Sequence, residues 1–225
     1  MKIFGHRGAA GLVAENTIES IVEAIKHGVD GVEIDVHRCK SGELIVIHDE
    51  TLERTTTGVG NVADHTLQEL QELRTKEGFI IPTLIQVLEC INGQCELNVE
   101  LKGKCTAMPT IEVLETYIAK TEWDYNQFII SSFDHAQLFE IKEMTSQFRL
   151  GVLTEEDITH ALPIAKKLQA FSVHLPITSI TIEEVREAKE LGYQVYIWTV
   201  NLVPLIVRSK TWKVDGIITD FPNFV

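Results

Sequence analysis

The sequence predicts an α/β fold, a single (β/α)8 (TIM) barrel. At 225 residues the chain has the length of one large domain, and 44% hydrophobic residues suffice for a substantial core. Eight apolar runs of strand length follow one another, and helical patterns separate most of them. An open doubly wound sheet is the alternative. That fold more often has a glycine-rich loop after its first strand, and Gly5, Gly8 and Gly11 lack the required spacing.

The predicted helices carry their own start and stop signals. Asn16, with Glu19 three residues later, is expected to cap the first helix, which Gly28 ends. Asp134 and Thr181 are expected to open two later helices. The predicted strands are Ile3–His6, Gly31–Val36, Glu96–Leu101, Phe128–Ser131, Leu150–Leu153, Ala170–His174, Gln194–Thr199 and Gly216–Thr219.

One segment interrupts this alternation. After the second strand, a turn at residues 40–42 predicts a hairpin whose returning arm, Glu43–His48, lies antiparallel to that strand and above the barrel. Such an arm brings His48 back near the level of Asp35. The following polar, threonine-rich stretch is too long for an ordinary loop, and long loops in compact domains are usually functional. We therefore predict one domain, residues 1–225, with an insertion at about 49–80.

Charge and apolar patterning exclude several classes of protein. A net charge of −13 argues against a sequence-independent nucleic-acid binder, which needs a basic face. The sequence has no run of ~20 apolar residues to span a membrane, and we expect no signal peptide, because the first motif begins at residue 6. The four cysteines lack the spacing of a zinc or redox motif. We expect a cytoplasmic protein with reduced thiols and no stable membrane insertion.

Carboxylates occupy strand positions at which a barrel core needs apolar residues. Glu33 and Asp35 are two apart in one strand and so point to the same face, and Glu100 lies on the next barrel strand. Because barrel active sites lie at the C-terminal ends of the strands, we expect the three to converge there. Such a set suits a hard divalent cation, Mg²⁺ or Ca²⁺. The simpler interpretation is a group of salt bridges with Arg7 and Lys102.

Two histidines, His6 and His48, are expected at the same end of the barrel. Together they suggest a general acid and a general base, since imidazole titrates near neutral pH. Alternatively, either of them is a metal ligand. His174 also falls at a strand end, without an evident partner, and the remaining histidines, His37 among them, are expected to face solvent.

Further polar and aromatic residues are expected near these groups. Arg7 and Lys102 are candidate phosphate contacts, although they could equally serve only to neutralise the carboxylates. Trp198 either fills the barrel or forms a flat wall against a small polyol.

A series of short motifs, each different from the others, runs along nearly the whole chain. They are His6-Arg7-Gly8, Glu15-Asn16-Thr17, Glu33-Ile34-Asp35, His48-Asp49, Arg54-Thr55-Thr56, Ile81-Pro82-Thr83-Leu84, Asn98-Val99-Glu100-Leu101-Lys102, Ser131-Ser132-Phe133, Trp198-Thr199-Val200-Asn201 and Val214-Asp215-Gly216-Ile217-Ile218-Thr219-Asp220. As an ordered set they resemble the glycerophosphodiester phosphodiesterase family. The resemblance implies a TIM barrel with a small insertion. It also implies hydrolysis of deacylated phospholipids, such as glycerophosphocholine, to sn-glycerol 3-phosphate and an alcohol.

The resemblance also implies roles for the matching positions. The metal ligands would be Glu33, Asp35 and Glu100, the acid–base pair His6 and His48, and the phosphate contacts Arg7 and Lys102. Glu15 and Asn16, in a matching motif, are further site candidates. The nucleophile would be water or the glycerol 2-hydroxyl, the latter through a cyclic phosphate. Two other functions stay open: another metal-dependent barrel enzyme, and a barrel that binds glycerophosphodiesters without cleaving them.

Overall fold

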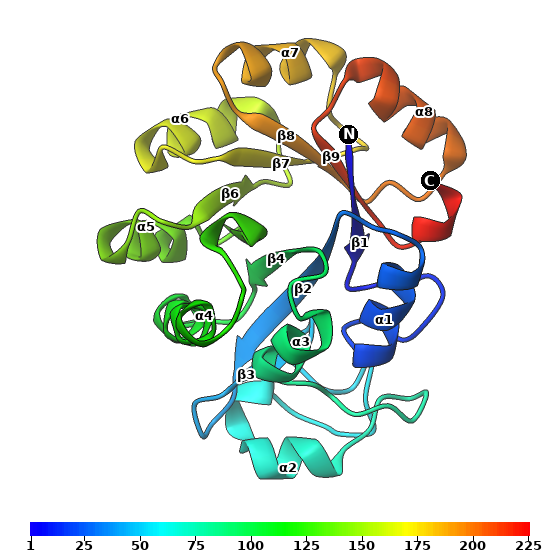
Figure 1. Cartoon of the computed structure of the whole chain (residues 1–225), viewed down its shortest axis with the longest axis vertical. Coiled ribbons are helices and arrows are strands. Elements are labelled where there is room, and N and C mark those ends of the chain that lie inside the picture. The colour runs from blue at the N-terminus through cyan, green and yellow to red at the C-terminus, as the bar shows by residue number, and fades with distance from the viewer.

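The computed structural model describes residues 1–225 and contains a closed barrel of eight parallel strands (Figure 1). Neighbouring strands pair in the order β1-β2-β4-β5-β6-β7-β8-β9, and β9 pairs with β1 to close the ring. The predicted TIM barrel is confirmed. The strands are β1 (Lys2–His6), β2 (Gly31–Arg38), β4 (Glu96–Leu101), β5 (Phe128–Ser132), β6 (Arg149–Leu153), β7 (Ser172–Pro176), β8 (Gln194–Trp198) and β9 (Gly216–Thr219).

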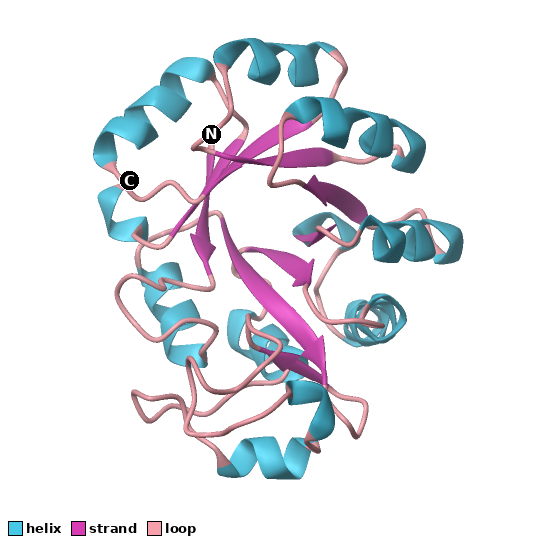
Figure 2. Cartoon of the chain, turned by 180° about the vertical axis from the view of Figure 1, so that it is seen from behind, coloured by secondary structure: helices cyan, strands magenta, loops and turns pink.

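Helices surround the strands on the outside of the barrel (Figure 2). The main core, a cluster of 44 buried residues, lies between these helices and the strands. The helices of this ring are α1 (Ile18–Lys26), α3 (Leu84–Ile91), α4 (Ala107–Lys120), α5 (His135–Met144), α6 (Ile158–Leu168), α7 (Ile182–Glu190) and α8 (Val203–Trp212), with short 3-10 turns η2 (Tyr125–Gln127) and η3 (Pro222–Phe224).

Aromatic side chains fill the barrel below its charged end. Phe4 and Tyr196 pack edge to face with ring centroids 5.5 Å apart. Glycines make the room: a Cβ on Gly31 would lie 2.3 Å from the Phe4 ring, and one on Gly216 would lie 2.5 Å from the Tyr196 ring. Because Phe4 comes two residues before His6, this apolar layer is a floor beneath the polar strand ends.

The predicted hairpin is present. β3 (Leu44–Val46) pairs antiparallel with the end of β2, and the segment after it contains η1 (Val62–Asp64) and α2 (Leu67–Glu72). In Figure 1, α2 lies at the edge of the molecule, outside the ring of helices. The segment has its own apolar cluster, formed with the hairpin by Cys39, Ile45, Ile47, Leu52, Val62, Leu70 and Ile81. The insertion therefore packs onto the hairpin.

The start of the first helix differs from the expectation. Thr17, not Asn16, is the N-cap of α1, and its hydroxyl accepts a hydrogen bond from the amide of Ser20. Asn16 has φ 57°, so its backbone is left-handed. Its side chain donates a hydrogen bond to Asp35 instead of capping the helix. The caps expected at Asp134 and Thr181 are confirmed.

Two further observations concern the chain as a whole. None of the helices combines the length and the apolar character that crossing a membrane requires. All four cysteines are free thiols.

Candidate active site

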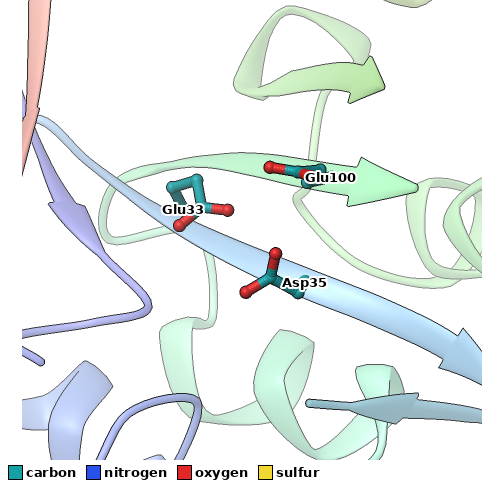
Figure 3. A group of neighbouring side chains, drawn as sticks. All are labelled: Glu33, Asp35 and Glu100. Atoms are coloured by element: carbon teal, nitrogen blue, oxygen red, sulfur yellow. The ribbon is translucent and has the colours of Figure 1, made fainter. Parts of the chain in front are cut away.

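Three carboxylates meet at the C-terminal end of the barrel. Glu33 and Asp35 extend from β2, and Glu100 extends from β4, whose register places it opposite Asp35. Figure 3 shows the three side chains pointing toward one another. One oxygen of each lies within 4.8 Å of the other two, and all three residues are buried. The alternation of side chains along two paired strands thus produces the convergence that the spacing predicts.

Neighbouring polar groups hold these carboxylates in place. The backbone N–H of Arg7 donates to Glu33 over 2.9 Å, and the Asn16 amide donates to Asp35 over 2.9 Å. The ammonium of Lys102 donates to Glu100 over 2.9 Å. Asn16 has a left-handed backbone, and its side chain also accepts the Asp35 backbone N–H over 3.3 Å.

The cluster holds more negative charge than these contacts neutralise. Burial raises the pKa of Glu33 well above its ordinary value, and the charges of Asp35 and Glu100 raise it further. Burial and Asp35 likewise raise the pKa of Glu100, against the opposing effect of Lys102. One oxygen of Glu33, Oε1, is buried without any hydrogen-bond partner. A buried oxygen without a donor, within a set of three carboxylates, fits a hard divalent cation.

His6 ends β1 beside this cluster. Its Nε2 lies 4.0 Å from a Glu33 oxygen, and its Nδ1 lies 2.6 Å from Asp220, the residue after β9. Asn201 donates its side-chain amide to Asp220 over 2.5 Å and accepts the Asp220 backbone N–H over 2.9 Å. Burial raises the pKa of Asp220, but the bonds from His6 and Asn201 more than offset this, so that the net pKa is lowered. An ionised Asp220 fixes the proton of His6 on Nδ1 and leaves Nε2 facing the carboxylates.

His48 is brought to the site by the hairpin. The preceding residue, Ile47, donates its N–H to the Asp35 carbonyl over 3.1 Å, so the returning arm reaches the level that the sequence predicts. The Nδ1 of His48 lies 2.6 Å from Asp49. Burial lowers the pKa of His48, although Asp35 and Asp49 act to raise it. His37, expected in solvent, is buried instead, and its Nε2 lies 2.9 Å from the His48 carbonyl oxygen.

The two candidate phosphate contacts differ in how many of their donors are in use. Arg7 donates to Glu15 over 2.7 Å, while its Nε, 3.4 Å from Asp35, makes no hydrogen bond. The Lys102 ammonium lies 5.1 Å from the Phe133 ring centroid, and that ring packs edge to face on Trp198. The indole N–H of Trp198 is buried without a partner. Arg7 and Trp198 thus each have one buried donor without a hydrogen-bond partner.

Two cavities adjoin these residues. One of about 720 Å³ extends from Glu100 and Lys102 over the ends of β5 and β6. The other, of about 650 Å³, lies between the loop after β1 and the insertion and is lined by Glu15, Arg54 and Phe79. The site therefore has room on two sides.

His174 is not brought to the carboxylates. It lies inside the barrel, fully buried, with its Nε2 2.8 Å from the Ser172 hydroxyl and its ring 5.0 Å from that of Tyr196. Burial lowers its pKa to about 3, so the ring is neutral. We leave His174 out of the candidate site.

Three residues of the matched motifs, to which the sequence analysis gave no role, contact the histidines of the site directly or indirectly. Asp49 bonds to His48, Asp220 bonds to His6, and Arg54 bonds to Asp49. The adjacency of Asp49 to His48 was a usable signal. So was the position of Asp220 directly after the last strand, because barrel closure brings that end beside the first strand.

Comparison with known proteins identifies the family. Residues 6–224 match the model of the glycerophosphoryl diester phosphodiesterase family. The chain is 37% identical to a glycerophosphodiester phosphodiesterase of Caldanaerobacter subterraneus subsp. tengcongensis, covering 98% of this chain and 94% of that protein. It is 35% identical to one of Bacillus altitudinis, covering 99% and 95%. The chain therefore belongs to the glycerophosphodiester phosphodiesterase family, and it is an enzyme, a phosphoric diester hydrolase.

A solved structure supports the same assignment. A phosphodiesterase of Oleispira antarctica, solved in complex with the product sn-glycerol-3-phosphate, superposes with a TM-score of 0.90 at 28% identity. The match covers 99% of this chain and 94% of that one. The barrel and its insertion thus follow the fold of a known phosphodiesterase.

Proposed function

We propose that this enzyme hydrolyses deacylated phospholipids to sn-glycerol 3-phosphate and an alcohol, using Mg²⁺ or Ca²⁺ held by Glu33, Asp35 and Glu100. One observation carries the proposal: two histidines, each paired with its own carboxylate, flank a buried three-carboxylate cluster at the end of a barrel. The product found in the Oleispira antarctica relative supports the choice of substrate. The family membership supports it as well.

The cation's contribution is electrostatic: when bound, it offsets the charge of a non-bridging phosphate oxygen. Arg7 and Lys102 add positive charge from the protein. The Arg7 Nε–H has no hydrogen bond of its own and lies 3.4 Å from Asp35, beside the cluster at which we place the phosphate. In a chain of net charge −13, these two cations concentrate positive charge at the place where an anionic substrate binds.

The histidines move the protons. One of His6 and His48 takes a proton from the nucleophile, which is water or the glycerol 2-hydroxyl, and the other gives a proton to the departing alkoxide. Asp220 and Asp49 each bond the Nδ1 of their histidine, so both Nε2 atoms are free for this exchange. The carboxylates also stabilise the imidazolium form of whichever ring holds the extra proton.

The two alcohol arms of the diester have space in the two cavities described above. Phe133 lines one of these cavities, and Trp198 packs edge to face behind it with an indole N–H that has no partner. This arrangement favours the role of Trp198 as a wall against a polyol.

The test is incubation with a panel of glycerophosphodiesters, with glycerol 3-phosphate release as the readout. We expect release from at least one member with Mg²⁺ or Ca²⁺ present, and none after thorough EDTA treatment until the cation is restored. Binding of these compounds without release from any of them would instead make the protein a non-catalytic binding barrel. Full activity after chelation would contradict the role of the cation.

A further inference from the structure

We propose that Arg54, in the insertion, is a positioning residue for His48: by fixing Asp49 it holds the imidazole in its working orientation. This inference rests on the proposed function, because it assumes that His48 transfers a proton. It gives the insertion a part in assembling the active site.

The guanidinium of Arg54 is held between two carboxylates by four hydrogen bonds. Its Nε and Nη2 donate to Asp49 over 2.5 and 2.9 Å. Its Nη1 and Nη2 donate to Glu15 over 2.8 Å each. Paired bonds of this kind, from a planar fork to a carboxylate, fix direction as well as distance.

Asp49 transmits this restraint to the histidine. Its Oδ1 accepts from Arg54 and also lies 2.6 Å from the Nδ1 of His48. The bond from Arg54 is the largest influence on Asp49 and lowers the pKa of that carboxyl, which keeps it ionised as a partner for the imidazole. Without Arg54, the bond to His48 would be left as the restraint on the direction of the Asp49 carboxylate.

Glu15 connects the same guanidinium to the barrel. Its Oε1 accepts from Arg54 and from Arg7, and Arg7 lies beside Asp35. Burial raises the pKa of Glu15, but the bonds from the two arginines hold it at about 2. A continuous chain of charged groups thus joins His48 on the hairpin to the carboxylate cluster on β2.

Arg54 lines one of the two cavities, but it is poorly suited to bind the substrate phosphate. Four of its five N–H donors are engaged, and two carboxylates already neutralise its charge. Arg7 differs, because its Nε–H lacks a partner. The two arginines therefore divide the work: Arg7 faces the phosphate and Arg54 positions the histidine.

The kinetic test uses Arg54→Lys, Asp49→Asn and the double variant. Lysine keeps the charge but cannot bond both carboxylates as a fork, so we expect kcat to fall about 10–100-fold with KM little changed. We expect the double variant to be no slower than the slower single variant, because both substitutions break the same support. Arg74→Ala is the matched control, since this arginine of the insertion donates only to the backbone carbonyls of Gln71 and Leu73.

Several outcomes would overturn the inference. Wild-type kcat in Arg54→Lys would show that charge alone suffices, a loss confined to KM would make Arg54 a substrate contact, and additive losses would separate it from Asp49. An inactive wild type would count against the proposed function instead. For that case, proton NMR supplies a readout independent of turnover. We expect a protected Nδ1–H resonance of His48 that Arg54→Lys abolishes and Arg74→Ala preserves, and its persistence in Arg54→Lys would refute the inference.

Discussion

Each of the two candidate acid–base histidines uses one ring nitrogen to bond a carboxylate and has the other available. The partners come from different places in the chain: Asp49 is the next residue after His48, whereas Asp220 is more than 200 residues after His6. Two segments far apart in the chain thus each provide a histidine bonded to a carboxylate through Nδ1. Because the two arrangements are alike, we infer that both rings transfer protons.

Replacing either ring tests that argument. We expect His6→Ala and His48→Ala each to lower kcat about 10²–10⁴-fold, because each removes a proton donor or acceptor. Asp220→Asn and Asp49→Asn should cost less than loss of the ring itself, since the imidazole remains. Steady-state kinetics on a glycerophosphodiester measure both effects, with circular dichroism to verify folding. Near-normal turnover in either folded alanine variant would contradict the assignment.

His174 gives a separate, pH-dependent expectation. Its pKa is lowered from 6.5 to about 3, so the unfolded chain binds a proton that the folded chain rejects. This group's contribution to the free energy of unfolding is therefore present above pH 6.5 and lost as the pH falls toward 3, at up to about 1.4 kcal/mol per pH unit. His174→Gln, which replaces the ring by a polar side chain that does not titrate, should flatten the slope of stability against pH below 6.5 and retain activity. Urea unfolding at several pH values measures this, and an unchanged slope would refute it.

Residue-scale prediction from the sequence succeeds where local spacing decides position. Glu33 and Asp35 share a face because strand side chains alternate, and Glu100 joins them because β2 and β4 pair in register. It fails where tertiary contacts decide. Asn16 is of a residue type that often caps helices, but its backbone is left-handed and its side chain bonds to Asp35. His37 reads as a loop histidine, but the hairpin buries it against His48.

At the scale of elements, β2 and β4 form a rigid pair that forces like charges together. Two of the three carboxyls, Glu33 and Glu100, have raised pKa values as a result. Both strands continue into an apolar core, so the site cannot relax by exposing them. A bound cation would take the place of these protons and neutralise the repulsion between the carboxylates.

That competition between protons and the cation predicts a pH-dependent stabilisation. In the metal-free protein the two glutamates bind protons more tightly than the unfolded chain does, so their contribution to stability is full below about pH 4.5 and falls as the pH rises through their folded pKa values. The rise in Tm caused by Mg²⁺ or Ca²⁺ should therefore be larger near pH 8 than near pH 5. At about 100 times Kd we expect roughly 5–10 °C at the higher pH.

Glu33→Gln is the matched control for this measurement, made by thermal unfolding after EDTA treatment. It keeps the shape of the side chain but removes one charge, so both the Tm rise and its pH dependence should diminish. An equal Tm rise at every pH, or the same rise in Glu33→Gln, would contradict the cluster as the binding site.

At the scale of the whole molecule, the barrel and the insertion share their connections. The apolar cluster of the insertion includes Ile45 and Ile47 of the hairpin, which is itself an extension of β2. Arg54 adds an ionic connection to Glu15 in the loop after β1. The sequence predicts the barrel from its recurrent strands. It does not predict how the insertion packs. That packing depends on contacts between residues that are irregularly spaced in the chain, so no periodic pattern reveals them.

These connections support the prediction that residues 1–225 form one domain. We expect calorimetry to show one cooperative unfolding transition for barrel and insertion together. Leu52→Ala, in the insertion cluster, should lower that single Tm, at a cost of about 2–5 kcal/mol. A separate early transition, shifted by Leu52→Ala while the main one stays fixed, would make the insertion an independent unit.

We propose that Glu33, Asp35 and Glu100 hold the cation on which phosphodiester hydrolysis depends. Anomalous diffraction from crystals soaked in Mn²⁺, a substitute for Mg²⁺, tests it most directly. We predict one strong peak among the three carboxylates, within direct coordination distance of the Glu33 oxygen that otherwise lacks a partner. We also predict that the peak disappears in Glu33→Gln together with the activity. No peak at saturating Mn²⁺, from protein that hydrolyses its substrate fully after chelation, would contradict the claim.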